Sequence, residues 1–153
     1  MPTPEERLEQ LGVSLPSPAV PVAAYVPCVR TGNLVFVSGQ VPLVDGKPSH
    51  LGRLGEGVGL QDGRAAARTC AINVIAALKV ELGELSRVRR VVKLTGFVAS
   101  TPDFTDQPKV ANGASELFGE VFGDAGRHAR AAVGVAALPL GVPVEVEAIV
   151  EVG

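Results

Sequence analysis

With 153 residues, the chain is long enough for one domain that buries roughly two-thirds of the surface its unfolded form exposes. Hydrophobic residues make up 46% of it and charged residues 20%, which excludes a disordered chain. The net charge of −2 and the lone short basic run Arg87–Arg90 argue against a dedicated nucleic-acid binder.

The cysteines and the apolar stretches indicate the compartment. Cys28 and Cys70 are far apart and form no CxxC motif, which favours a reducing compartment without a disulfide framework. Residues 1–10 are acidic and lack the basic and apolar regions of a signal peptide. No stretch approaches the roughly 20 apolar residues needed to span a bilayer. We therefore expect a soluble cytoplasmic protein with no membrane partner.

The first 27 residues predict a short helix followed by an extended arm. Thr3 can cap the helix, Pro4 suits its first position, and Glu6 completes a capping box. Gly12 should end this helix. Four prolines then fall within Val13–Pro27, which predicts an extended segment wrapped over the surface.

A β-hairpin is predicted next. Cys28–Ser38 contains two β-rich runs joined by a turn at Thr31–Asn33, and Val41–Val44 adds a further short strand. The glycine in Ser38–Gln40 is typical of a β-bulge or of a close backbone approach. Asp45–Gly63 has six glycines and little periodicity, so we expect a loop that is functional, inter-subunit or disordered.

Two helices and one long strand follow. Apolar residues recur at helical spacing over residues 62–83, and Val88–Ala99 is the next strand. A second helix should begin at Thr105 or Asp106 and end at Gly123. The order strand–strand, helix, strand, helix, strand–strand predicts an α+β fold, with one mixed sheet and both helices on one face. The other face would be bare in a monomer, so we expect an oligomer that covers it.

The last third of the chain contains a nearly uncharged run. No ionisable side chain lies between Arg130 and Glu145, and such an apolar run should form the centre of a sheet. Prolines and a glycine divide it into two extended pieces, roughly Ala129–Ala137 and Pro143–Val150. We expect adjacent strands to bring Arg130 and Glu145 towards each other at the rim of the sheet.

This Arg–Glu pair has two interpretations. It is a salt bridge that joins neighbouring strands, or it is a binding site. In a binding site the planar guanidinium of Arg130 would grip a carboxylate by two parallel hydrogen bonds. Glu145 would then orient or deprotonate a water aimed at the bound molecule. From the residues alone we infer a small anionic ligand.

Other common chemistries find no support. The sequence has no P-loop and no dinucleotide-binding glycine pattern, and its two histidines lack partners at metal-ligand spacing. Ser38 has no triad partner, and Cys28 and Cys70 are expected in the core. His128, two residues before Arg130, either lines a pocket or is an ordinary histidine at the end of a strand.

Several positions together match the motifs of one known family: Tyr25, Gly32–Gln40, Asn112, Glu116, Phe118, Arg130, Leu138-Pro139 and Val144–Glu147. On these positions the chain resembles the RidA/YjgF family, which is also called the endoribonuclease L-PSP family, in a less-characterised branch. The resemblance runs from about Tyr25 to the C-terminus, which divides the chain into an N-terminal helix and arm over residues 1–24 and a single family-like domain over 25–153.

The resemblance implies a chorismate-mutase-like fold and a homotrimer with active sites in clefts between subunits. In the family's deaminases the substrate is a reactive enamine or imine derived from an amino acid, which is hydrolysed to a 2-keto acid and ammonia. By this resemblance Arg130 clamps the substrate carboxylate and Glu145 helps to position the attacking water. No metal or organic cofactor is implied.

The resemblance also implies substrate-binding positions. Tyr25 and the backbone at Gly39 would shape the pocket, and Asn112 would support it. Family deaminases commonly have a cysteine two residues after the arginine, where this chain has Ala132, and that position acts largely through its backbone carbonyl. Two alternatives stay open: a non-catalytic or regulatory trimer that binds small carboxylates and, less favoured, an endoribonuclease.

Overall fold

The computed structural model describes residues 1–18 and 23–153. Its helices are α1 (Pro4–Gln10), α2 (Leu60–Leu82) and α3 (Gln107–Phe122), with short 3-10 helices η1 (Leu85–Arg87), η2 (Gly123–Gly126) and η3 (Pro139–Gly141). Its strands are β1 (Cys28–Thr31), β2 (Leu34–Gln40), β3 (Leu43–Val44), β4 (Lys47–Pro48), β5 (Arg53–Leu54), β6 (Gly57–Val58), β7 (Val88–Ala99), β8 (Ala129–Val135) and β9 (Val144–Val152).

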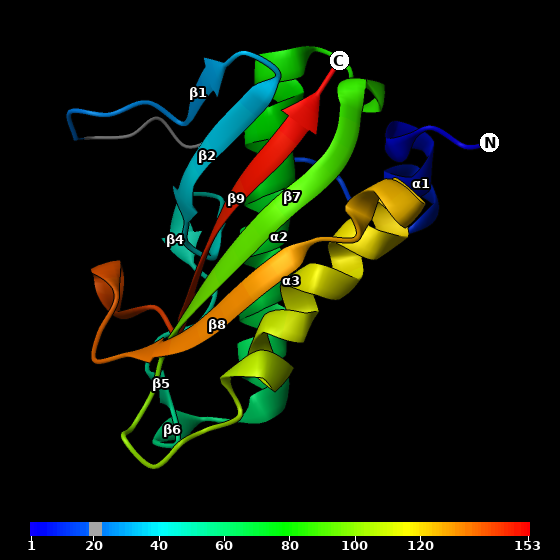
Figure 1. Cartoon of the computed structure of the whole chain (residues 1–153). Coiled ribbons are helices and arrows are strands. Elements are labelled where there is room, and N and C mark those ends of the chain that lie inside the picture. The colour runs from blue at the N-terminus through cyan, green and yellow to red at the C-terminus, as the bar shows by residue number, and fades with distance from the viewer. Residues whose placement is uncertain (19–22) are drawn as a thin grey trace.

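One five-stranded mixed sheet organises the molecule, with the strand order β1-β2-β9-β7-β8. Strands β7 and β8 are parallel, and the other pairs are antiparallel. Helices α2 and α3 pack side by side behind the sheet in the view of Figure 1. The predicted α+β fold with both long helices on one face is therefore confirmed.

Two close approaches hold the helical layer together. A Cβ on Gly113 of α3 would overlap the backbone carbonyl of Arg64 on α2, so the two helices touch through their backbones there. A Cβ on Gly96 of β7 would lie 3.2 Å from the Cβ of Ala111 on α3. Small residues at these points let the helices lie close to the sheet and to each other, and large apolar side chains such as Phe118 fill the remaining core.

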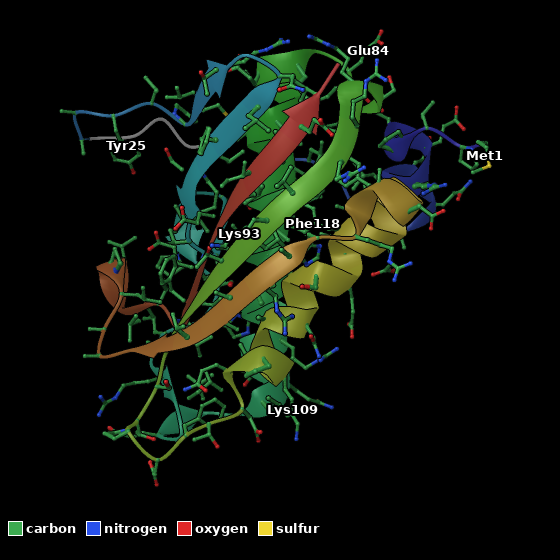
Figure 2. The ribbon with its side chains drawn as sticks, in the orientation of Figure 1. Met1, Tyr25, Glu84, Lys93, Lys109 and Phe118 are labelled. Atoms are coloured by element: carbon green, nitrogen blue, oxygen red, sulfur yellow. The ribbon has the colours of Figure 1, made fainter. Side chains whose placement is uncertain are left out.

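The opposite face of the sheet is open. Side chains alternate along a strand, so Phe36, Phe97, Val133 and Ile149 point away from the two long helices. Phe36 is 42% exposed and Val133 is 44% exposed. Among the described residues no helix covers this face, which Figure 1 shows turned to the viewer and from which Lys93 also projects (Figure 2).

Helix α1 packs against α3 and is bonded to α2. Thr3 caps it as predicted, because its Oγ1 accepts a hydrogen bond from the Glu6 backbone N–H at 3.1 Å. Leu8 is buried in the core, and the Glu5 carboxylate accepts from Lys79 Nζ at 2.8 Å. In the predicted arm, residues 13–18 and 23–27 contain no helix or strand, and residues 19–22, which include one of the four prolines, lie outside the described residues.

Three expectations about the chain path need correction. Residues 45–63 are not one loop, because they contain the short strands β4, β5 and β6 and the start of α2 at Leu60. Strands of two residues are too short to show the alternation of apolar and polar residues, so they could not be predicted from the sequence. Only the second piece of the uncharged run lies at the centre of the sheet, as β9, whereas β8 lies at the edge. The two pieces are also not neighbours, because β7 lies between them.

Candidate functional site

A bulge in β2 brings the backbone of Gly39 against a glutamate. The register of β2 with β9 shifts between Val37 and Gln40, which confirms the predicted bulge. A Cβ on Gly39 would overlap the carboxylate of Glu145. The predicted close backbone approach is therefore also confirmed, and only glycine leaves room for the Glu145 side chain in this position.

A cavity of about 760 Å³ lies beside this contact. It includes three of the residues predicted from the sequence: Tyr25, Gly39 and Glu145. Tyr25 lies on the arm before β1 (Figure 2) and is 56% exposed. The other lining residues come from the arm, the β2–β4 region, α2 and the loop before β9: Pro16, Ser17, Pro27, Gln40, Val41, Leu43, Asp45, Gly46, Asn73, Pro139 and Leu140.

The surroundings of Glu145 disfavour its ionised form. It is half-buried, and this burial raises the pKa of its carboxyl group above the usual range for glutamate. The negative charge of Glu147, two residues along the same face of β9, raises the pKa further. A carboxylate with a raised pKa is a better proton acceptor than an ordinary surface glutamate.

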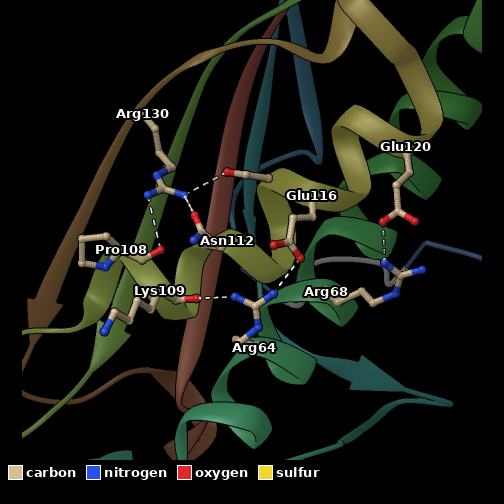
Figure 3. Close-up of polar contacts among 9 residues, drawn as sticks. Arg64, Arg68, Pro108, Lys109, Asn112, Glu116, Glu120 and Arg130 are labelled. Carbon is tan, nitrogen blue, oxygen red and sulfur yellow. Dashed lines mark hydrogen bonds and ion pairs between the residues drawn. The ribbon is translucent and has the colours of Figure 1, made fainter.

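Arg130 lies elsewhere, on the helix side of the sheet. Its Nη1 donates to Asn112 Oδ1 at 2.8 Å and to Ser115 Oγ at 3.1 Å, and its Nη2 donates to the Pro108 carbonyl oxygen at 3.3 Å. All three acceptors belong to α3, and Figure 3 shows Pro108 and Asn112 facing the guanidinium. The side chain is thus fixed in one orientation against its own chain.

These bonds leave one edge of the guanidinium available. The group carries five N–H donors, and the three bonds to α3 use both donors on Nη1 and one on Nη2. Within residues 1–18 and 23–153, no acceptor is bonded to the Arg130 Nε–H or to the second Nη2–H. Two donors side by side on a planar group match the two oxygens of a carboxylate.

The structure separates Arg130 from Glu145. Arg130 is opposite Leu94 on β7, whereas Glu145 is opposite Phe97, an odd number of residues further along the same strand. Side chains on one strand alternate between faces, so the arginine and the glutamate point to opposite sides of the sheet. The predicted approach of the two across adjacent strands is wrong, and no salt bridge joins them among the described residues.

The predicted site residues therefore form two groups. The first, which we call the arginine group, contains Arg130 with Asn112 and also Ala132, which follows Arg130 by two on β8 and so shares its face. The second, the glutamate group, contains Glu145, Gly39 and Tyr25 around the cavity. Each group has part of what the predicted chemistry requires.

Sequence reasoning missed two residues that shape these groups. Asn73 lines the cavity from α2, and its Nδ2 donates to the carbonyl oxygens of Val41 and Leu43 at 3.0 and 3.1 Å. A lone amide among the apolar residues of a buried helix was the available signal. Ser115 contacts Arg130, and nothing in its sequence context marks it.

The other titratable residues add no competing centre. The thiol of Cys70 is buried, as expected, and burial and the charge of Glu145 raise its pKa. Cys28 is only partly buried, and burial raises its pKa to about 11.

No group of three metal-ligating side chains occurs in the part of the chain that the structure describes. In the same residues, no helix is long and apolar enough to cross a membrane.

Comparison with protein families identifies the chain. The model of the family described as "YjgF/chorismate mutase-like, putative endoribonuclease" matches residues 5–151. The chain belongs to this family. The protein TCP17 of Trypanosoma cruzi is 51% identical over 145 residues, which cover 94% of this chain and 91% of TCP17.

Solved structures agree with this assignment. The protein Atu1372 of Agrobacterium tumefaciens, described as of unknown function, is 49% identical with a TM-score of 0.93, over 98% of this chain and 92% of that one. A "putative endoribonuclease" of Shewanella oneidensis is 36% identical with a TM-score of 0.96, and the match covers 99% of this chain and 100% of that one. Escherichia coli TdcF, solved with bound serine, is 28% identical with a TM-score of 0.66, and the match covers 90% of this chain and 94% of that one.

Proposed function

We propose that this YjgF-family protein hydrolyses reactive enamines and imines derived from amino acids to 2-keto acids and ammonia. The observation that carries the proposal is the orientation of Arg130, whose three bonds to α3 leave two parallel donors for a carboxylate. An amino-acid-derived imine carries a carboxylate next to its C=N carbon. Arg130 would therefore hold that carbon at a fixed place.

We further propose that the site is completed between subunits of a homotrimer. In one chain the arginine group and the glutamate group lie on opposite sides of the sheet, so a single copy cannot present both to one small molecule. The open face, with exposed Phe36 and Val133, and the free edge of β8 offer surfaces on which another copy can pack. Association would place Arg130 of one copy across a cleft from Glu145 of the next.

The chemistry follows from these two side chains. Water adds to the carbon of the protonated imine while the Glu145 carboxylate accepts one proton from the water, which gives a neutral carbinolamine. Glu145 then gives this proton to the amine nitrogen, the C–N bond breaks and ammonia leaves. The carbinolamine hydroxyl loses its proton to the Glu145 carboxylate as the carbonyl of the 2-keto acid forms, and the departing ammonia takes that proton from Glu145 as ammonium. The raised pKa of Glu145 suits these transfers. Because imines already hydrolyse slowly in water, positioning supplies the required acceleration.

Two alternatives compete with this function. A binding protein without turnover is consistent with the same Arg130 geometry, and the structure of TdcF with serine shows that a relative holds a small amino acid. Ribonuclease activity is suggested by the family description. The net charge of −2 and the 4% aromatic content favour a small acid over RNA, because strand binding uses cationic grooves and stacking aromatics.

The first test is imine hydrolysis. We expect the protein to accelerate the loss of 2-iminopropanoate generated in situ, and Arg130→Ala to lower kcat/KM by about 100-fold or more, since a charged hydrogen-bonding pair to the substrate is removed. Arg68→Ala is the matched control, because Arg68 pairs with Glu120 on the outer side of the helices (Figure 3). An Arg130→Ala protein as active as its parent would refute the assignment. Keto-acid binding by calorimetry without turnover across a panel of imines would favour the binding protein.

The second test addresses the shared site. Arg130→Ala and Glu145→Gln, each inactive alone, are unfolded together at equal concentration and refolded. If each site takes Arg130 from one copy and Glu145 from another, random assembly restores about a quarter of parental activity. If both residues act within one chain, the mixture stays inactive. Refolding each variant alone supplies the baseline.

A further inference from the structure

A second line of hydrogen bonds extends behind Arg130. Ser115, which accepts from Arg130 Nη1 at 3.1 Å, also contacts His128 Nε2 at 2.8 Å. The other ring nitrogen, His128 Nδ1, contacts the carbonyl oxygen of Gly126 at 2.6 Å. A continuous chain of contacts therefore links the guanidinium on β8 to the 3-10 helix η2.

The chemistry of the two ends fixes the direction of the first and last bonds in this chain, and the neutral form of the His128 ring then fixes the middle one. Arginine can only donate, so Ser115 Oγ accepts from it. A carbonyl oxygen can only accept, so His128 Nδ1 carries a hydrogen and donates to Gly126. In the neutral imidazole this leaves Nε2 as an acceptor, and the Ser115 hydroxyl hydrogen points to it. Each donor meets an acceptor, and the Ser115 lone pairs are turned towards Arg130.

The far end of the chain is rigid. A Cβ on Gly126 would overlap the carbonyl of Phe118, so the backbone of η2 lies directly on α3. The His128 ring also packs edge-on against Phe118, with ring centroids 6.3 Å apart and an interplanar angle of 69°. The imidazole is thus held from two directions, independently of Arg130.

We propose that Ser115 and His128 are positioning residues that set the orientation of the Arg130 guanidinium and so determine how well this protein captures a carboxylate. This inference rests on the proposed function. His128 aligns the Ser115 hydroxyl, and the aligned hydroxyl together with Asn112 fixes both donors of Nη1. The Nε–H and the second Nη2–H are then presented in one direction. Without the chain the guanidinium turns about its bonds, and the carboxylate loses a prepared partner.

Kinetics and binding test this role. We expect Ser115→Ala and His128→Leu each to raise KM for 2-iminopropanoate, and the Kd for pyruvate, by about tenfold, while kcat changes by less than about threefold. Ser115→Thr, which keeps the hydroxyl, should restore the parental KM. Thr69→Ala is the matched control, because its hydroxyl bonds only to Ala65 O within α2. A purely structural role would lower thermal stability and leave KM unchanged, and that result would overturn the proposal.

A readout that needs no substrate separates this proposal from the proposed function. In 15N-labelled parent protein, the Arg130 guanidinium signals should show slow rotation about Nε–Cζ, and His128 should show a protonated Nδ1. In Ser115→Ala and His128→Leu the rotation should become fast. Unchanged rotation in both variants overturns the inference even if imines are hydrolysed. If rotation changes but the parent neither hydrolyses imines nor binds pyruvate, the positioning stands and the proposed function fails.

Discussion

The arginine group and the glutamate group differ in how their charged side chains are held. Arg130 makes three hydrogen bonds to α3, and one of its acceptors is itself oriented by His128. Glu145 has a different environment: it packs against the backbone of Gly39, beside a cavity and near the like charge of Glu147. Hydrogen bonds hold Arg130 where it lies, whereas burial and a like charge disfavour the ionised form of Glu145.

This difference suits the two tasks that the proposed function assigns to Arg130 and Glu145. Gripping a carboxylate needs a fixed direction, so a rigid donor pair is suitable. Moving a proton needs a group whose two protonation states are close in free energy at the working pH, so a destabilised carboxylate is suitable. Residues that are kept for activity often reduce stability, and the contrast predicts where this occurs in the chain.

The largest effect is expected from Glu145→Gln. Removing the proton acceptor should lower kcat by about 1,000-fold, within the range typical of general-base groups. The same change should raise thermal stability at pH 7, because the pKa of Glu145 is higher in the folded chain than its ordinary 4.5. A carboxyl group whose pKa is raised by folding contributes stability below pH 4.5, and this contribution is lost as the pH rises through the pKa of the folded state. The stability gained by Glu145→Gln should therefore disappear in acid.

Calorimetric melting at pH 7 and pH 4 measures how the difference in stability between Glu145→Gln and its parent changes with pH. Glu151→Gln on the same strand is the control, since Glu151 is held by Asn33 Nδ2 at 3.3 Å and lies outside both groups. A Glu145→Gln protein that is less stable than its parent at pH 7 would contradict the proposed contrast.

A smaller but still large effect is expected from Gly39→Ala. The added methyl group would displace the Glu145 carboxylate, and a shift of about 1 Å in a catalytic group can cost about 100-fold in rate. The fold should survive, because the displaced atoms are the end of a flexible side chain. Gly119→Ala is the control, since a Cβ there meets nothing within 4 Å. Parental activity in Gly39→Ala, with an unchanged melting temperature, would show that the position of Glu145 does not matter.

The smallest effect is expected from Glu147→Gln. Glu147 raises the pKa of Glu145 through its charge, so the neutral amide should lower that pKa. In the proposed mechanism activity requires the ionised Glu145, so it should fall as the pH drops through that pKa. The acid limb of the kcat/KM profile should therefore move to lower pH, with little change in rate at its plateau. If the acid limb of Glu147→Gln stays at the parental pH, or moves to higher pH, the fall in kcat/KM is not caused by protonation of Glu145.

Local features of this chain could be predicted from the sequence because their causes are local. The Thr3 cap, the hairpin around Gly32-Asn33, the limits of β7 and the bulge at Gly39 each depend on a few neighbouring residues. The family resemblance likewise selected residues that lie in one or the other of the two groups.

The relation between these features could not be predicted, because it depends on strand order. The chain leaves β7, forms α3 and returns as β8 parallel to β7 on its outer side, whereas β9 pairs with the inner side. Arg130 and Glu145 are therefore separated, although they close the same uncharged run. The link between Ser115 and His128 was hidden for a similar reason, since it joins a helix to the segment after η2 through their packing.

The hydrogen bonds that hold Arg130 also mean that its side chain loses conformational entropy during folding. Fixing a mobile arginine side chain costs about 2 kcal/mol of rotamer entropy. Here α3 imposes that ordering during folding, so under the proposed function an arriving acid would meet a side chain already held in one conformation. The plane of the guanidinium would then set the plane of the bound carboxylate, and acids whose shape forces another tilt should be rejected by angle rather than by size.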